Sequence, residues 1–324
     1  MSSENPILSI QYLRAIAAVC VIVAHASGIL VYQAGVDVFF VISGFIMWTI
    51  TKRPQTPSAF LMNRLVRIIP LYWISTVLMA WHQHAPIVAV LKSMFFIPYF
   101  GAGSQIWPVL VQGWTLNYEV FFYLLIAASL LLPRTARLAA IIGVIALLSA
   151  TSLLLMPRGA ALMTYTNTLL VEFCFGIIIA EMRLSSLLPS SLVGLALIGL
   201  ASLLFGLPAL DVLPGVDRFF VWGVPSACVV LGMLALENGG WILRSRYLLL
   251  VGDASYAIYL FQSFLLKSLF RISADFPVPL QVIFVVVCVS AAGLIISIWV
   301  EKPLIALLRS QRPLLPAYRF RSGG

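Results

Sequence analysis

Arg14 and His25 lie in one apolar segment near the N-terminus, within YLRAIAAVCVIVAHASG. Burying ionisable groups among apolar residues is costly, so each is a candidate for function. In a helix, their separation of eleven positions makes about three turns, which places both side chains on one face, about 16 Å apart along the axis. A guanidinium binds anions, and an imidazole accepts protons. The two cannot touch each other, but one long ligand lying along the helix can contact both.

A group of polar residues is expected at the depth of Arg14. Arg64 and Arg67 in NRLVRIIPLYW are three residues apart and project from one side of a predicted helix, near its positively polarised start. They either bind an anion or form a positively charged flank. Glu301 in WVEKP is expected to reach water or an arginine. A later helix start adds three residues, of which the first two are also N-cap candidates: Asp253, Ser255 and Tyr256.

A second group is expected with His25, toward the opposite end of the helices. Folding the first hairpin about residues 32–33 places Asp37 about one turn outward of His25, and Glu119 in QGWTLNYEVFFY enters its helix from the same side. A histidine and two carboxylates at similar depth predict a general-base cluster. Alternatively, Asp37 caps its helix and Glu119 forms a structural pair. Ser43 and Gly44 could simply permit close helix packing.

The remaining histidines and the cysteines do not predict a metal site. His82 and His84 in WHQH point to opposite sides of an extended segment, without a nearby acidic or cysteine partner. The cysteines lie singly in separate apolar runs, so they are expected to be small hydrophobic residues. They are Cys20, Cys174, Cys228 and Cys288.

The elements that position these residues are predicted from composition. The chain has 324 residues, of which 62% are hydrophobic and 10% charged, whereas a soluble domain has about 25% charged residues. Apolar runs recur without the alternation of a β-barrel, and about 20 residues cross a membrane. We predict an all-α, polytopic membrane bundle of about ten transmembrane helices. They lie near 9–31, 36–51, 66–81, 114–132, 137–156, 164–182, 190–207, 217–236, 254–272 and 279–300.

The rest of the chain suggests one transmembrane domain over residues 1–324. The segment 82–113 is too polar to span and is expected to form a re-entrant or interfacial loop. The N-terminus lacks a basic region and a cleavage signal, so the first helix is expected to remain. Fourteen basic residues flank one set of helix ends and four or five the other, which predicts that both termini, including the tail from about 302 to 324, are cytoplasmic. No folded basic surface for nucleic acid is expected.

Six motifs in this order resemble the acyltransferase 3 family, membrane proteins that acylate sugars, and the chain looks most similar to exopolysaccharide acetyltransferases. The motifs are LRAIAAVCVIVAH, GVDVFFVISGF, RLVR, WTLNYEVFFY, GDASYAIYLFQ and EKP. The resemblance covers nearly the whole chain. Gln262 stands in YLFQ where many relatives carry a histidine. This difference argues against a mechanism that needs two histidines, but not against one built around His25.

The resemblance implies an acyl-CoA donor on the cytoplasmic side of a bacterial inner membrane, and no permanently bound cofactor. Arg14, Arg64 and Arg67, together with Tyr256, would bind acetyl-CoA through charge-assisted contacts to its phosphates. The pantetheine arm would then run outward beside the first helix and deliver the thioester near His25. The acyl group could also be another short acyl group.

The acceptor implied by the resemblance is a saccharide, free or lipid-linked, reached from the membrane or the exterior. His25 would act as general base, or would be acetylated first and pass the group outward. Asp37 or Glu119 would orient the imidazole and stabilise its cation. Three further residues are expected to contact the acceptor: Ser43, Trp114 and Asn117.

A transporter or flippase of a lipid-linked saccharide is the alternative function. It too would place charged residues within the bundle. No inverted repeat and no matching pair of broken helices is visible in the sequence, which favours the enzyme. Binding of acetyl-CoA by the purified protein would separate the two.

Overall fold

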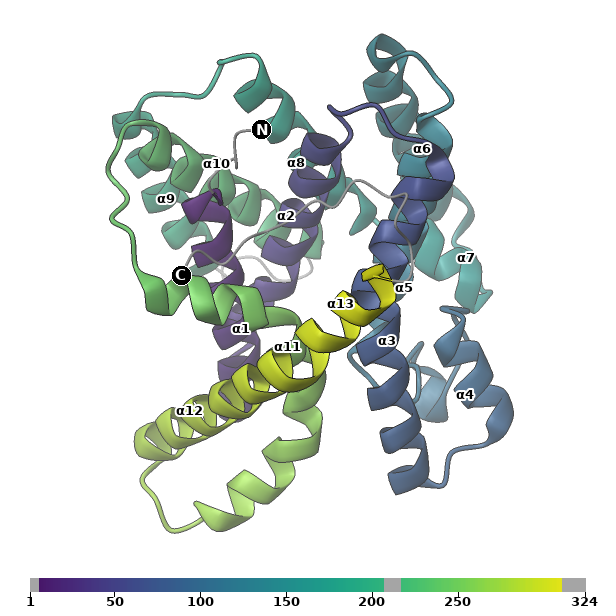
Figure 1. Cartoon of the computed structure of the whole chain (residues 1–324), viewed down its shortest axis with the longest axis vertical. Coiled ribbons are helices and arrows are strands. Elements are labelled where there is room, and N and C mark those ends of the chain that lie inside the picture. Colours follow the sequence, from purple (N-terminus) through teal and green to yellow (C-terminus); the bar gives the residue numbers. More distant parts are fainter. Residues whose placement is uncertain (1–5, 207–216, 311–324) are drawn as a thin grey trace.

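The computed structural model describes residues 6–206 and 217–310, and within these ranges the chain contains helices and no β-strand. Figure 1 shows the helices packed around α1 and α2, with α12 and α13 forming one long diagonal rod. The helices are α1 (Leu8–Ser27), η1 (Leu30–Gln33), α2 (Ala34–Ile50), α3 (Pro57–Gln83), α4 (Ile87–Met94), η2 (Ala102–Ser104), α5 (Gly113–Ser129), α6 (Arg134–Leu155), α7 (Ala160–Tyr165), α8 (Leu170–Leu184), α9 (Ser191–Gly206), η4 (Phe219–Gly223), α10 (Val224–Asn238), α11 (Arg246–Ile272), α12 (Val278–Ile296), η5 (Ser297–Glu301) and α13 (Lys302–Ser310).

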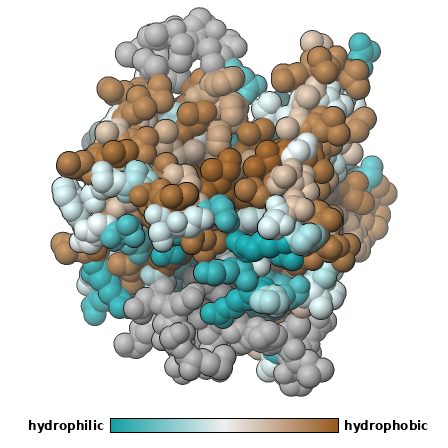
Figure 2. Space-filling view, turned by 90° about the horizontal axis from the view of Figure 1, so that it is seen from above, coloured by the Kyte–Doolittle hydropathy of each residue, from teal (hydrophilic) through white to brown (hydrophobic). Residues whose placement is uncertain are grey.

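The all-helical membrane fold agrees with the sequence prediction. Each of the ten predicted segments coincides with a helix, and eight helical stretches in the described part of the chain are long and apolar enough to cross a membrane. The other two predicted segments lie in α5, with 17 residues, and α9, with 16. Apolar side chains cover much of the surface in Figure 2, next to a band of hydrophilic ones. The protein is therefore a multi-pass membrane protein whose outer surface suits lipid.

The predicted loop 82–113 lies against α3 and does not span. It contains the eight-residue α4 and the short η2. The Tyr72 hydroxyl donates to the Ser93 carbonyl at 3.1 Å, and the indole of Trp73 donates to the Met94 carbonyl at 2.9 Å. These two bonds attach the end of α4 to the middle of α3.

The α1–α2 hairpin sets the depth of the polar residues. The chain turns at Gly28, which caps α1 with a φ of +73°, a conformation that favours glycine. Gly35 then packs against Ala17 and Val21 so closely that a Cβ would overlap the Ala17 carbonyl. Residue 35 therefore lies beside residues 17–21, and α2 descends along α1 from there.

Close glycine contacts join α2 to α8 in the centre of the bundle. A Cβ on Gly44 would overlap the backbone of Phe173, and one on Gly176 would overlap the Val41 carbonyl. Small residues allow helices in a membrane to approach in this way. The predicted packing role of Gly44 is thus confirmed.

Ion pairs tie the last helices to the rest of the bundle. Arg67 pairs with Glu301 at 3.0 Å, and Lys302 lies 3.8 Å from Asp253. The expected arginine partner of Glu301 is therefore Arg67. The cytoplasmic location of the termini stays a prediction. Three of the fourteen basic residues on which it depends lie outside the described residues: Arg312, Arg319 and Arg321.

Candidate active site

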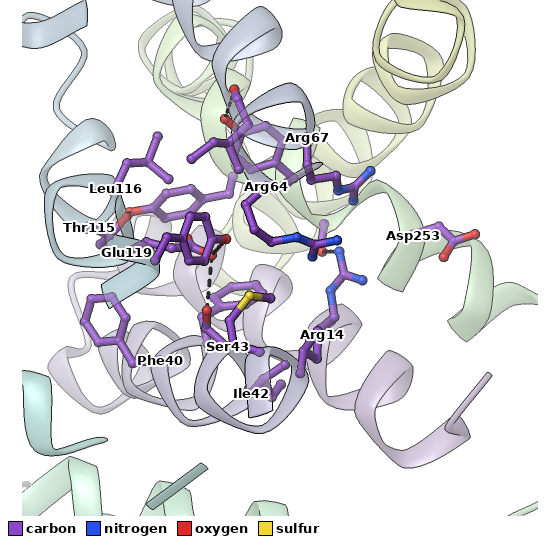
Figure 3. Close-up of a pocket in the computed structure, with 18 of the residues that line it drawn as sticks. Arg14, Phe40, Ile42, Ser43, Arg64, Arg67, Thr115, Leu116, Glu119 and Asp253 are labelled. Carbon is purple, nitrogen blue, oxygen red and sulfur yellow. Dashed lines mark hydrogen bonds between the residues drawn. The ribbon is translucent and has the colours of Figure 1, made fainter. Parts of the chain in front are cut away.

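A cavity of about 390 Å³ opens between α1, α2, α3, α5, α11 and α13. Its floor and walls bring together residues that are far apart in the sequence. Figure 3 shows the guanidinium groups of Arg14, Arg64 and Arg67 gathered on one side and Glu119 with Ser43 on the other. The half-buried side chains of Asp253 and Lys302 also line the cavity, which therefore reaches solvent beside them.

Two of the three arginines have no carboxylate partner among the described residues. Arg14 donates to the Gln11 side-chain oxygen at 3.2 Å and to the Ser255 hydroxyl at 3.0 Å. The buried Nε of Arg64 has no hydrogen-bond partner in this part of the structure. Arg67 is paired with Glu301. Arg14 and Arg64 thus remain able to bind an anion in the cavity.

The predicted contribution of a helix dipole to this site is wrong. Helix α3 begins at Pro57, with Thr56 as its N-cap, so Arg64 lies about 10 Å inside the helix. The effect of the positive helix end fades within the first turn. The charge of the cavity therefore comes from the side chains alone.

Tyr256 lines the cavity as well, and its hydroxyl donates to the Ile68 carbonyl at 2.7 Å. This bond connects α11 to α3, directly after the two arginines of α3. Tyr256 therefore holds the two walls of the cavity together, besides offering its ring to a bound molecule.

Glu119 lies with the arginines and not with His25. Its carboxylate accepts from the Ser43 hydroxyl at 3.2 Å and from the Tyr123 hydroxyl. Ser43 follows Gly35 by eight residues on α2, which is about 12 Å deeper. Because Gly35 lies beside residues 17–21, Ser43 and Glu119 reach the depth of Arg14.

Asp37 is also not beside His25. The hairpin turns at Gly28 and not at 32–33, so Asp37 returns to the depth of residues 17–21, about 6–12 Å below the imidazole. Its carboxylate is 0% exposed and accepts two bonds from Arg218, at 3.1 and 2.7 Å. The expected cluster of one histidine and two carboxylates therefore does not form.

A buried cluster around Asp37 was missed in the sequence. Glu172 on α8 is 0% exposed, and its carboxyl lies within hydrogen-bond reach of the Asp37 carboxyl. A Cβ on Gly223 would lie 2.9 Å from Glu172 Oε1. Arg218, counted in the sequence only as a flanking charge, precedes the π-helix η4 and points into this cluster. The sequence feature that could have indicated this cluster is the acidic residue in the apolar run VEFCFG.

His25 is exposed in the last turn of α1 and does not line the cavity. Its Nδ1 lies 2.7 Å from the Val21 carbonyl. Ala18 and Val21, which lie between Arg14 and His25, are 1% and 2% exposed. The packing of these residues separates the imidazole from the arginines, contrary to the expectation of one shared space.

The expected acceptor residues are also separated. Ser43 lines the cavity beside Glu119, whereas Trp114 and Asn117 do not. Trp114 packs edge-on against Phe40, and Asn117 is 3% exposed. Asn117 is therefore buried, whereas the half-buried Trp114 lies outside the cavity.

Comparison with known proteins identifies the family. Residues 7–302 match the acyltransferase domain of the acyltransferase 3 family. The chain belongs to this family. A relative, the exopolysaccharide production protein ExoZ of Rhizobium meliloti (strain 1021), is 36% identical over 291 residues, covering 86% of this chain and 91% of ExoZ. No solved structure matches the chain. The resemblance of the six motifs is thus confirmed for an acyltransferase in the membrane.

Proposed function

We propose that this acyltransferase transfers an acetyl group from acetyl-CoA to a hydroxyl of an exopolysaccharide sugar in a bacterial inner membrane. The family membership supports acyl transfer, and the similarity to an exopolysaccharide production protein supports the acceptor class. The cavity is the observation that carries the donor assignment, because Arg14 and Arg64 face it without carboxylate partners in the described structure.

The charge of the cavity suits the donor. Five cationic side chains line it, against the two carboxylates of Glu119 and Asp253. CoA carries a diphosphate and a further phosphate on its ribose. Cationic side chains outnumber carboxylates at the cavity even when Glu301, the partner of Arg67, is counted, so the cavity attracts CoA from the water phase. The diphosphate binds Arg14 and Arg64, and Arg67 supports it from the pair with Glu301. Glu119 is a nearby opposite charge to Arg14 and Arg64.

The reaction takes place outward of this phosphate site. The pantetheine arm runs from Arg14 along α1, and the thioester approaches His25 about 16 Å away. Val36 of α2 lines the cavity, and Val21 of α1, which packs against Gly35, is 2% exposed. They have to move apart for the arm to pass.

His25 then serves as the base. It takes the proton of the sugar hydroxyl as the oxygen attacks the thioester carbonyl, the carbon–sulfur bond breaks, and the CoA thiolate receives the proton. In the other order, the imidazole first displaces CoA to form acetyl-histidine, which the hydroxyl then cleaves. Trapping of acetyl-histidine without acceptor would support the second order, and sequential kinetics without an adduct the first.

The test compares the acetyl content of the polymer in a strain that lacks this protein and in the same strain with it restored. Restoration should return the O-acetyl signal in the NMR spectrum of the polymer. The variant His25→Ala should be inserted and folded but should restore none of the signal, whereas His82→Ala, which replaces an exposed histidine away from the cavity, should restore all of it. Full acetylation with His25→Ala would refute the assignment of the base, and unchanged acetylation on deletion would refute the function.

A further inference from the structure

One face of α13 forms a wall of the cavity. Lys302, Ile305, Ala306 and Arg309 all line it. Their spacing of three and four residues places them on one side of the helix. In Figure 1, α13 lies beside α3, which carries the inner arginines. The last helix therefore contributes to the site and does not only flank the membrane.

The two cationic side chains of this face form only weak interactions with other described residues of the protein. Lys302 Nζ lies 3.8 Å from an Asp253 oxygen, with side chains 41% and 27% exposed, and such a pair in water contributes little. Arg309 is half-buried and forms no ion pair or hydrogen bond within residues 6–206 and 217–310. Its charged neighbours include Arg67 and Arg64, which carry the same charge. An anion between them would relieve this repulsion.

The position of α13 is fixed relative to the inner arginines. Glu301 directly precedes α13, is 1% exposed, and pairs with Arg67 at 3.0 Å. It also accepts a bond of 2.8 Å from Ser297 at the start of the π-helix η5. The inner arginines and the cations of α13 are thus held at a set spacing.

We propose that Lys302 and Arg309 form a second anion subsite that binds the 3′-phosphate of CoA and so selects CoA over its dephosphorylated form. This inference rests on the proposed function, in which acetyl-CoA is the donor. CoA presents two anionic groups, joined through the ribose. The inner arginines bind the diphosphate, so the second phosphate lies nearer to the cavity mouth, where α13 supplies two cations. Ile305 and Ala306 lie between those cations and contact the ribose and adenine.

The experiment measures binding of CoA and of 3′-dephospho-CoA to the purified full-length protein in lipid nanodiscs by isothermal titration calorimetry. A charge-assisted contact predicts that CoA binds about ten-fold or more tightly than dephospho-CoA. Arg309→Gln should weaken CoA binding by about that factor and leave dephospho-CoA binding unchanged. Arg309→Lys should keep part of the preference. Arg244→Gln, which removes an exposed arginine that does not line the cavity, is the matched control and should keep all of it.

The outcomes separate the subsite from the donor assignment. Equal affinity of the wild type for both compounds, or a preference that survives in Arg309→Gln, overturns the subsite while the donor assignment stands. Absence of any binding of CoA and acetyl-CoA to the wild type overturns both. The thermal unfolding midpoint of each variant is measured in parallel, and Lys302→Gln repeats the test independently if Arg309→Gln does not fold.

Discussion

Removing Arg218 should destabilise the protein strongly, because it would leave a buried carboxylate without its partner. Asp37 is 0% exposed and accepts both of its bonds from this guanidinium, at 3.1 and 2.7 Å. Breaking a buried pair by removing one member costs about 3–5 kcal/mol. Arg218→Gln should therefore lower the free energy of unfolding by about that amount.

Replacing Asp37, the other member of the pair, should lower the free energy of unfolding by less. The Arg218 side chain is 29% exposed, so in Asp37→Asn the guanidinium can still reach water, and we expect a loss of about 1–2 kcal/mol. The double variant removes both charges of this ion pair, while the buried carboxyl of Glu172 remains in the cluster. It should be more stable than Arg218→Gln alone, with a coupling energy of about 2–3 kcal/mol in the double-mutant cycle.

The assay is unfolding of the purified protein in mixed micelles, followed by tryptophan fluorescence. Arg271→Gln, which removes an exposed arginine in the last turn of α11, is the control and should change the stability by less than about 0.5 kcal/mol. A loss below about 1 kcal/mol for Arg218→Gln, or a double variant as unstable as the single one, would refute the reasoning. A catalytic Asp37 would instead lose activity in a fully folded Asp37→Asn variant.

Two more predictions concern packing and the donor site. Gly176→Ala should destabilise the protein by about 1–3 kcal/mol in the same unfolding assay, because the new methyl group would overlap the Val41 carbonyl. The control Gly143→Ala should not destabilise it, because nothing lies within 4 Å of a Cβ there. Equal stability of both variants would contradict the α2–α8 contact. Arg64→Gln should weaken acetyl-CoA binding about ten-fold or more, as measured by calorimetry. It should not lower the unfolding midpoint, since the Nε of Arg64 has no partner in the described structure. An unchanged affinity would count against the phosphate site.

Much of the cationic side of the cavity could be predicted from the sequence. Arg14, Arg64, Arg67 and Tyr256 come from three helices and line one cavity. The predicted topology placed these residues on the same side of the bundle, although α3 and α11 begin at Pro57 and Arg246, eight or nine residues before the predicted starts. The pairing of residues three apart also held, since Arg64 and Arg67 share one face of α3.

The outer residues could not be predicted, because their depth depends on where a turn begins. Gly28 places the turn four to five residues earlier than the assumed position at 32–33. In an antiparallel hairpin, moving the turn changes which residues of the two helices lie opposite each other by twice that number. Asp37 consequently descends past His25 to the depth of Ala17. Its partner Arg218 follows a separate segment far along the chain, and no local pattern connects the two.

The structure does not give Arg14 and His25 the shared space that the sequence predicts. Arg14 lines the cavity, and His25 is exposed on the surface at the other end of α1. Residues between them on α1 are buried. In the proposed mechanism, this arrangement keeps the thioester from water on the acceptor side until the layer at Val21 opens. Hydrolysis of the donor would otherwise compete with transfer. Because the same helix carries both residues, their spacing of eleven positions stays fixed while α2 moves. The proposed opening therefore lies between α1 and α2, where Gly35 packs closely against Ala17 and Val21.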